Sequence, residues 1–303
     1  MSIAAMGDRA GDTRLHGILM MLVACTFFTV LDAVAKTLSH TLPPLEVAWF
    51  RYLVHMLLLV GLLAPRPARL LPALRTRRLG LQVLRGTFLL GSTVFNFIAL
   101  HHLQLAETTS INFAGPLVIT ALAGPMLGEW ADRRRWMAVA AGFVGVMIVV
   151  QPGSGALAFE AVYSVAAMAC NAVYVILTRR LAPTENSMGL LLYSAVVGTV
   201  LLTPAMPAVW VTPVDLTTWG LIVALGALGA IGHFFLIRGH AYAPASLLAP
   251  FGYSQIIGAI AAGYLVFNQL PHTSTILGSV VIVCSGLYIL KREDVMRPRR
   301  RRA

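Results

Sequence analysis

The sequence predicts an all-α integral membrane protein with ten transmembrane helices, arranged as a 5+5 inverted repeat with both termini in the cytoplasm. Composition, the spacing of apolar runs and an internal repeat support this prediction. Of the 303 residues, 58% are hydrophobic and 12% are charged, whereas a soluble domain carries about 25% charged residues. The mean hydropathy is +0.78. These values exclude an ordinary soluble enzyme and a disordered chain, because most of the chain is suited to lipid.

Ten apolar runs have lengths close to the roughly 20 helical residues that cross a bilayer. Prolines and charged residues separate them, as in Pro43-Pro44 and in the segment Pro65-Arg66-Pro67. The fifth and tenth runs are the shortest. The predicted spans are 15–37, 46–64, 79–101, 106–128, 136–151, 157–179, 187–209, 217–240, 245–268 and 274–291.

The distribution of basic residues predicts the orientation of these spans. With a cytoplasmic amino terminus, every Lys and Arg except Lys36, Arg51 and Arg85 falls on a cytoplasmic segment. Cytoplasmic loops are enriched in Lys and Arg, so both termini are expected in the cytoplasm. The basic, Leu- and Ala-rich composition favours a multi-pass protein of the bacterial inner (plasma) membrane. The formal net charge of +11 is explained by this orientation signal, and no nucleic-acid-binding motif accompanies it.

The chain also contains an internal repeat. Small and large apolar residues follow the same order in Ala106–Asp132 and Ala245–Pro271. Each half therefore holds five spans, and an odd number reverses the orientation of the second half. Such inverted repeats bind their substrate near the bilayer midplane, between the halves. We divide the chain into a cytoplasmic N-terminal segment (1–14), a first repeat (15–151), a second repeat (157–291) and a basic cytoplasmic tail (292–303).

The order of short motifs in the first repeat is that of a known family. The motifs are Arg85-Gly86, Phe97-Ile98-Ala99-Leu100, Pro116, Leu127-Gly128-Glu129, Val144-Gly145-Val146 and Pro152-Gly153. This order resembles the EamA domain of the drug/metabolite transporter (DMT) superfamily. The resemblance implies two EamA repeats, a central cavity between the third, fourth, eighth and ninth spans, and secondary transport of small metabolites such as amino acids. The second repeat departs from the pattern, since Phe267-Asn268-Gln269 replaces Gly128-Glu129-Trp130 and Gln255 stands opposite Pro116.

Charged residues inside the predicted spans are the first candidate site residues, because each costs at least about 2.5 kcal/mol at bilayer depth without a partner or a watery cavity. Asp32 and Lys36 share a helix face. Asp32 and Arg51 are expected about 9 Å below the outer surface, and we predict that they approach each other. Arg51 or Lys36 would then anchor an anionic group and Asp32 would take up a proton. A structural ion pair between the first two spans explains the same residues, and both interpretations stay open. Arg85 lies near the cytoplasmic end of its span and can snorkel to the interface, and a structural role is favoured for it.

Polar and aromatic residues in the spans around the implied cavity are further candidates. Pro116 and Pro250 predict bends beside it. The substrate or coupling candidates are Asp32, Lys36, Arg51, Asn96, Asn112, His233, Tyr253 and Gln255, and Phe95, Phe113, Phe251 and Ser254 are further lining residues.

The predicted function is secondary transport of amino acids or related metabolites by alternating access, with export favoured. An importer of a riboflavin-like vitamin or an S-adenosylmethionine-like cofactor is the alternative. An intramembrane enzyme using Asp32, His55 or His233 is disfavoured because the sequence has no HExxH or GxSxG motif. A non-transporting membrane subunit is disfavoured because charged residues are retained near one depth of the membrane. We therefore expect no enzyme activity, no cofactor and no metal site. The expected partners are a small-molecule substrate, the lipid bilayer and a proton or counter-solute, with a homodimer left open.

Overall fold

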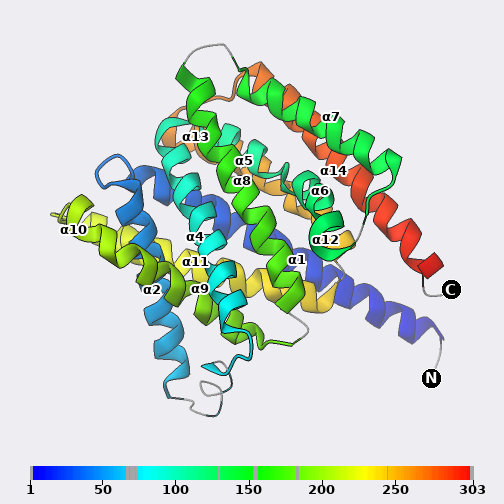
Figure 1. Cartoon of the computed structure of the whole chain (residues 1–303), viewed down its shortest axis with the longest axis horizontal. Coiled ribbons are helices and arrows are strands. Elements are labelled where there is room, and N and C mark those ends of the chain that lie inside the picture. The colour runs from blue at the N-terminus through cyan, green and yellow to red at the C-terminus, as the bar shows by residue number, and fades with distance from the viewer. Residues whose placement is uncertain are drawn as a thin grey trace.

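A computed structural model of the chain describes residues 3–65, 68, 72, 74–128, 130–152, 156–181, 184–243 and 245–300. Every regular element in these residues is a helix (Figure 1). Residue Glu129 of the EamA-like motif and the end of the predicted basic tail, 301–303, lie outside the described residues. The elements are α1 (Ile3–Leu38), α2 (Pro44–Leu63), α4 (Leu79–His102), α5 (Leu105–Asn112), α6 (Gly115–Leu127), α7 (Arg133–Val150), α8 (Ala156–Leu181), α9 (Ser187–Leu202), η1 (Thr203–Ala205), α10 (Met206–Val209), α11 (Leu216–Tyr242), α12 (Ala245–Gly252), α13 (Ser254–Phe267) and α14 (Thr273–Arg300).

Eight of the described helices are long and apolar enough to cross a membrane. Two predicted spans depart from that pattern. The predicted span 106–128 is divided into the shorter helices α5 and α6. The predicted span 136–151 lies in α7 up to Val150, where the helix ends, and α7 begins with three arginines, so its apolar part is short. The structure thus supports an all-helical, multi-pass membrane protein.

Two helices are interrupted at corresponding places of the two repeats. The first interruption separates Asn112, the last residue of α5, from Gly115, and Pro116 follows at the start of α6. The second separates Gly252, the last residue of α12, from Ser254 of α13. A proline supplies no backbone N–H and restricts φ, which favours such breaks. Both interruptions place backbone ends and polar side chains inside the helical bundle.

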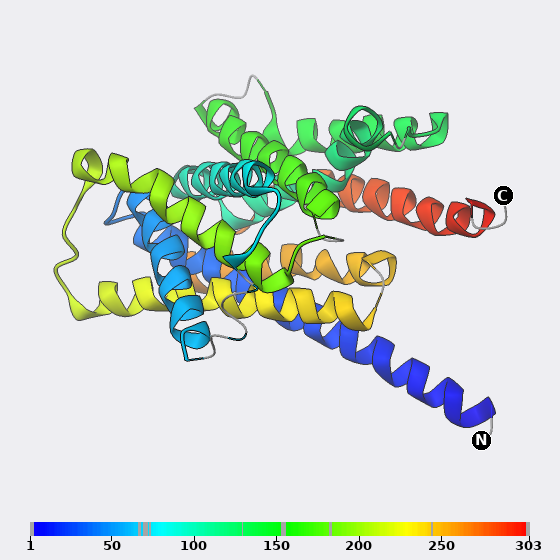
Figure 2. The same cartoon turned by 60° about the horizontal axis from the view of Figure 1, so that its bottom comes forward.

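The long helices pack in pairs that join the two halves. α1 packs along α11, and α4 packs along α8. α2 packs on α9, and α7 packs on α14, where the two helices run side by side in both views (Figures 1 and 2). The beginning of α1 and the end of α14 lie on the same side of the bundle. Large apolar side chains such as Ile257 and Leu265 are exposed on the outside, as contact with lipid requires.

Candidate functional site

A chain of hydrogen bonds joins α1, α4 and α5 inside the bundle. Asn96 Nδ2 of α4 donates to Asp32 Oδ1 of α1 over 3.2 Å. Asn112 Nδ2, at the end of α5, donates to Asn96 Oδ1 over 2.8 Å. All three side chains are half-buried, although each lies on a helix that is packed by other helices. We call these three residues the Asp32–Asn112 chain, and it brings together three of the residues that the sequence nominated.

Arg51 lies beside this chain and binds a different residue of α4. Its Nη1 donates to Thr93 Oγ1 over 3.1 Å, and its Cζ lies 4.9 Å from the centre of the Tyr52 ring. Asp32 and Arg51 interact electrostatically, but no ion pair within 4 Å joins them in the part of the chain that the structure describes. The two side chains therefore interact without forming the direct ion pair of the structural interpretation. Thr93 and Asn96 are one turn apart on α4, and these neutral side chains take the hydrogen bonds instead.

Two histidines on α2 and α11 contact each other. The rings of His55 in α2 and His233 in α11 are stacked with centroids 6.3 Å apart. Phe28 of α1 meets the His233 ring edge-on at 5.1 Å. His55 follows Arg51 by one turn of α2, so the two share a face. The sequence nominated His233 as a lining residue, but the spacing along the chain gave no signal for its contact with His55.

Residues at the two helix interruptions meet each other. The rings of Phe113 and Tyr253 lie 5.2 Å apart, so the break between α5 and α6 contacts the break between α12 and α13. Tyr253 is buried, and its hydroxyl has no hydrogen-bond partner among the described residues. Gln255 is half-buried in the first turn of α13. Tyr253 thus joins the halves by packing, and no described hydrogen bond links it to Asp32.

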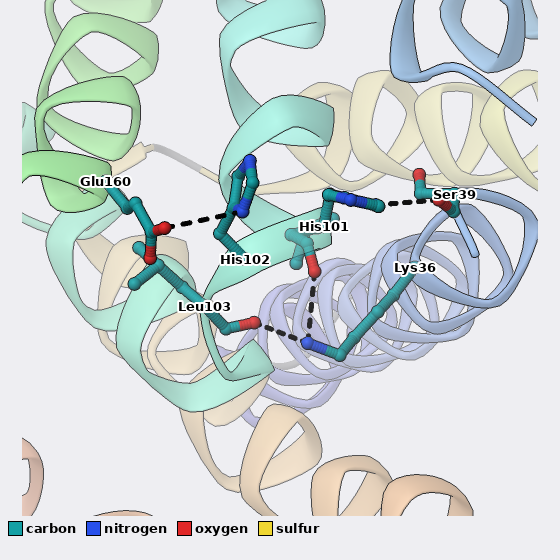
Figure 3. A network of polar contacts seen from close by, with 7 residues as sticks. Lys36, Ser39, His101, His102, Leu103 and Glu160 are labelled. Atoms are coloured by element: carbon teal, nitrogen blue, oxygen red, sulfur yellow. Dashed lines mark hydrogen bonds and ion pairs between the residues drawn. The ribbon is translucent and has the colours of Figure 1, made fainter. Parts of the chain in front are cut away.

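Lys36 lies apart from the Asp32–Asn112 chain. Its Nζ donates to the backbone oxygen of Leu100 over 3.0 Å and also to that of Leu103, at the end of α4 (Figure 3). The side chain is only 3% exposed, and the Phe267 ring lies 5.5 Å from Nζ. The last carbonyl groups of a helix lack partners within that helix and carry partial negative charge, so a buried cation is stabilised there. This geometry favours the structural interpretation of Lys36.

Arg85 is also held inside the protein, at the other end of α4. Its side chain is 1% exposed. Nη2 donates to Ser194 Oγ over 2.8 Å and to the backbone oxygen of Leu190 in α9. The guanidinium carbon lies 5.2 Å from the centre of the Tyr174 ring of α8. Arg85 does not snorkel, because α9 supplies buried acceptors for Nη2 and α8 places the Tyr174 ring against the guanidinium. This geometry favours the structural interpretation of Arg85.

Comparison with known proteins identifies the family. Residues 15–151 and 158–291 each match the EamA-like transporter family. The chain belongs to this family. It is therefore a drug/metabolite transporter of the EamA type, with two copies of the family unit, as the motif order predicted. Family membership indicates a membrane transporter rather than an enzyme.

Several bacterial relatives cover nearly the whole EamA-type chain. The S-adenosylmethionine uptake transporter of Rickettsia prowazekii is 29% identical over 93% of this chain and 94% of its own length. The pseudopaline exporter of Pseudomonas aeruginosa is 28% identical over 90% of this chain and 95% of its own length. The riboflavin transporter of Vibrio cholerae is 27% identical, with coverages of 92% and 94%. A solved crystal structure with 17% identity matches with a TM-score of 0.63, covering 91% of this chain and 98% of that one, which shows the shared fold.

Proposed function

We propose that this EamA-type protein is a secondary transporter that moves a small metabolite with an amino acid group by alternating access. The Asp32–Asn112 chain is the observation that carries the proposal. A carboxylate inside a membrane span requires a partner or a watery cavity, and the described hydrogen bond to Asp32 comes from a neutral amide. Its negative charge is therefore available to a substrate ammonium group or to a proton.

The second charge of an amino acid group has a partner nearby. The guanidinium of Arg51 uses Nη1 for Thr93, and its buried Nε has no partner among the described residues. A planar guanidinium is suited to binding a carboxylate. Asp32 and Arg51 together would bind the ammonium and carboxylate of one zwitterion, which explains why the two side chains do not neutralise each other directly.

We further propose that the chain crosses the bacterial inner membrane ten times, in two inverted halves with both termini in the cytoplasm. The packing of α1 on α11 and of α4 on α8 supports this, because each pair combines the first long helix of one family unit with the third of the other. The matching interruptions near Pro116 and Pro250 support it as well. The bacterial origin of the relatives is consistent with the inner membrane.

The helix interruptions offer a physical route for alternating access. The segments α6 and α13 can change their angle relative to α5 and α12 without breaking a continuous ladder of helix hydrogen bonds. The Phe113–Tyr253 contact lies where these four segments meet. A substrate changes the balance between outward and inward states only through different affinities for the two states. Asn112 connects this region directly to the binding chain.

Export of an amino acid or a related compound is the first candidate. Uptake of a nucleotide-derived cofactor is the second, and the Rickettsia relatives, which are S-adenosylmethionine uptake transporters, favour it. S-adenosylmethionine itself carries an amino acid group, so the same pair of charges would serve both candidates. A riboflavin-like vitamin lacks that group and would require the aromatic residues to dominate binding.

Counterflow in proteoliposomes tests the proposal. Vesicles containing the purified protein are preloaded with an amino acid, S-adenosylmethionine or riboflavin, and uptake of the labelled compound is followed with and without a pH gradient. We expect saturable exchange of a compound with an amino acid group, absent from protein-free vesicles. Exchange of riboflavin alone would overturn the proposed substrate class, and no exchange by folded protein would contradict transport of these compounds.

A further inference from the structure

A cavity of about 380 Å³ is lined by none of the three residues of the Asp32–Asn112 chain and lies where α7 ends and α14 begins. Its apolar wall includes Leu103, Ile111 and Val149, and its polar wall includes Glu107 and His272. At about 30 Å³ for each water molecule, this volume is large enough for a small organic solute. The established family membership assigns no role to this cavity.

Glu107 gives the cavity a buried negative charge. Glu107 is 8% exposed. Oε2 accepts a hydrogen bond of 3.0 Å from the backbone N–H of Gln104, as part of a helix cap. No described hydrogen bond reaches the other carboxylate oxygen, and Glu107 is one of the residues that line the cavity. Lys36 interacts electrostatically with Glu107, but its Nζ is directed to the carbonyl oxygens of Leu100 and Leu103 (Figure 3).

The charge and polarity of the wall restrict the ligand. Glu160 precedes the lining residue Ala161 but is not itself a lining residue, and it lies 3.5 Å from His102 Nδ1 (Figure 3). The lining includes neither Lys nor Arg. Within the described residues, no group of three His, Cys, Asp or Glu side chains is placed to hold a metal ion. A carboxylate in a wall that combines apolar and polar side chains is suited to an organic cation, which is less strongly hydrated than a metal ion.

We propose that this cavity binds an organic cation, with a quaternary ammonium or sulfonium group, and that Glu107 supplies the counter-charge. The cation belongs to a small solute or to a lipid headgroup. This site is separate from the transport site around Asp32. Its test measures binding, so failure of the cation site leaves the transport proposal standing, and the reverse also holds.

Choline binding to the purified full-length protein tests the cation site. Equilibrium dialysis with labelled choline is carried out in nanodiscs of phosphatidylglycerol, with 3,3-dimethyl-1-butanol as a neutral competitor of the same shape. We expect saturable choline binding that the neutral compound displaces poorly. Glu107→Gln keeps an acceptor for Gln104 but removes the charge, so it is expected to weaken choline binding about tenfold or more, about 1.4 kcal/mol or more.

Glu46→Gln is the matched control. Glu46 is a fully buried carboxylate outside the cavity lining, and its Oε2 accepts from the backbone N–H of Val211, which glutamine also allows. This variant should bind choline as the wild type does. The proposal is overturned by absence of saturable choline binding in the wild type, by unchanged binding in Glu107→Gln, or by equal displacement with the neutral competitor.

A second membrane composition identifies the source of the cation. If the lipid headgroup occupies the site, the affinity for choline is lower in nanodiscs of phosphatidylcholine than in phosphatidylglycerol. The variant Glu107→Gln then shows no such difference between the two lipids. An affinity equal to that in phosphatidylglycerol supports a site for a soluble cation.

Discussion

Gly145 of α7 and Gly278 of α14 meet backbone to backbone. A Cβ built on Gly145 would lie 2.9 Å from the carbonyl oxygen of Gly278, and a Cβ built on Gly278 would lie 2.6 Å from the carbonyl oxygen of Gly145. Small residues allow helices in a membrane to approach this closely, which increases van der Waals contact. The contact joins the last helix of the first family unit to the last helix of the second.

Gly278→Ala is expected to lower the free energy of unfolding by about 1–3 kcal/mol, the usual cost of inserting an atom into a packed site. The new methyl group would meet backbone atoms of Gly145 and Val149, which cannot rotate away. Thermal unfolding of the purified protein checks this. Gly61→Ala is the control, because its Cβ would meet nothing within 4 Å. Equal unfolding temperatures for the two variants would contradict the close packing.

Arg85→Met is expected to destabilise the protein while leaving transport by the folded fraction intact. The substitution removes the hydrogen bonds that tie α4 to Ser194 and Leu190, and a hydrogen bond to a charged group contributes about 1.5–3 kcal/mol. Arg238→Met serves as the control, since Arg238 is exposed and bonds to Tyr242 of its own helix. A normal unfolding temperature with lost transport would instead make Arg85 a transport residue.

Lys36→Met separates the two interpretations of Lys36. Loss of its bonds to the end of α4 should lower the unfolding temperature but leave the KM for the transported solute unchanged. The measurements are thermal unfolding and the concentration dependence of counterflow. A raised KM at an unchanged unfolding temperature would show that Lys36 binds the substrate.

The cap formed by Asp215, which lies outside the membrane spans, is expected to make the stability of the protein depend on pH. Its carboxylate accepts hydrogen bonds from the backbone N–H and the hydroxyl of Thr218, and these bonds hold the pKa of Asp215 below its usual value. A carboxyl whose pKa is lower in the folded than in the unfolded state stabilises the fold at pH values above its unfolded-state pKa, about 3.9. This stabilisation is lost as the pH falls through the folded-state pKa.

The variant Asp215→Ala should therefore unfold at a lower temperature than the wild type at neutral pH, and the difference should shrink as the pH falls below about 4. Thermal unfolding over a pH series measures this. A difference that grows on acidification would contradict the assigned cap.

The sequence predicted the helical membrane class and the family, because apolar runs, basic loops and the motif order are properties of the chain itself. It also nominated Asp32, Asn96 and Asn112. It did not predict their direct connection, since a helix that is apolar on every face gives no phase from which side-chain directions can be read. The partners of Arg51 and Arg85 were missed for a related reason. Thr93 and Ser194 are common residues in a span, and only the packing of α4 against its neighbours makes them acceptors.

The role of the Asp32 charge in transport is tested by comparing counterflow by the wild type with counterflow by Asp32→Asn. Asparagine keeps an oxygen that can accept from Asn96 but removes the negative charge. Asp215→Ala, which removes a carboxylate outside the spans, is the control. We predict exchange slowed by about tenfold or more, equivalent to about 1.4 kcal/mol, in Asp32→Asn and normal exchange in the control, with an unchanged unfolding temperature for Asp32→Asn. Wild-type exchange by Asp32→Asn would contradict a transport site built on the charge of Asp32.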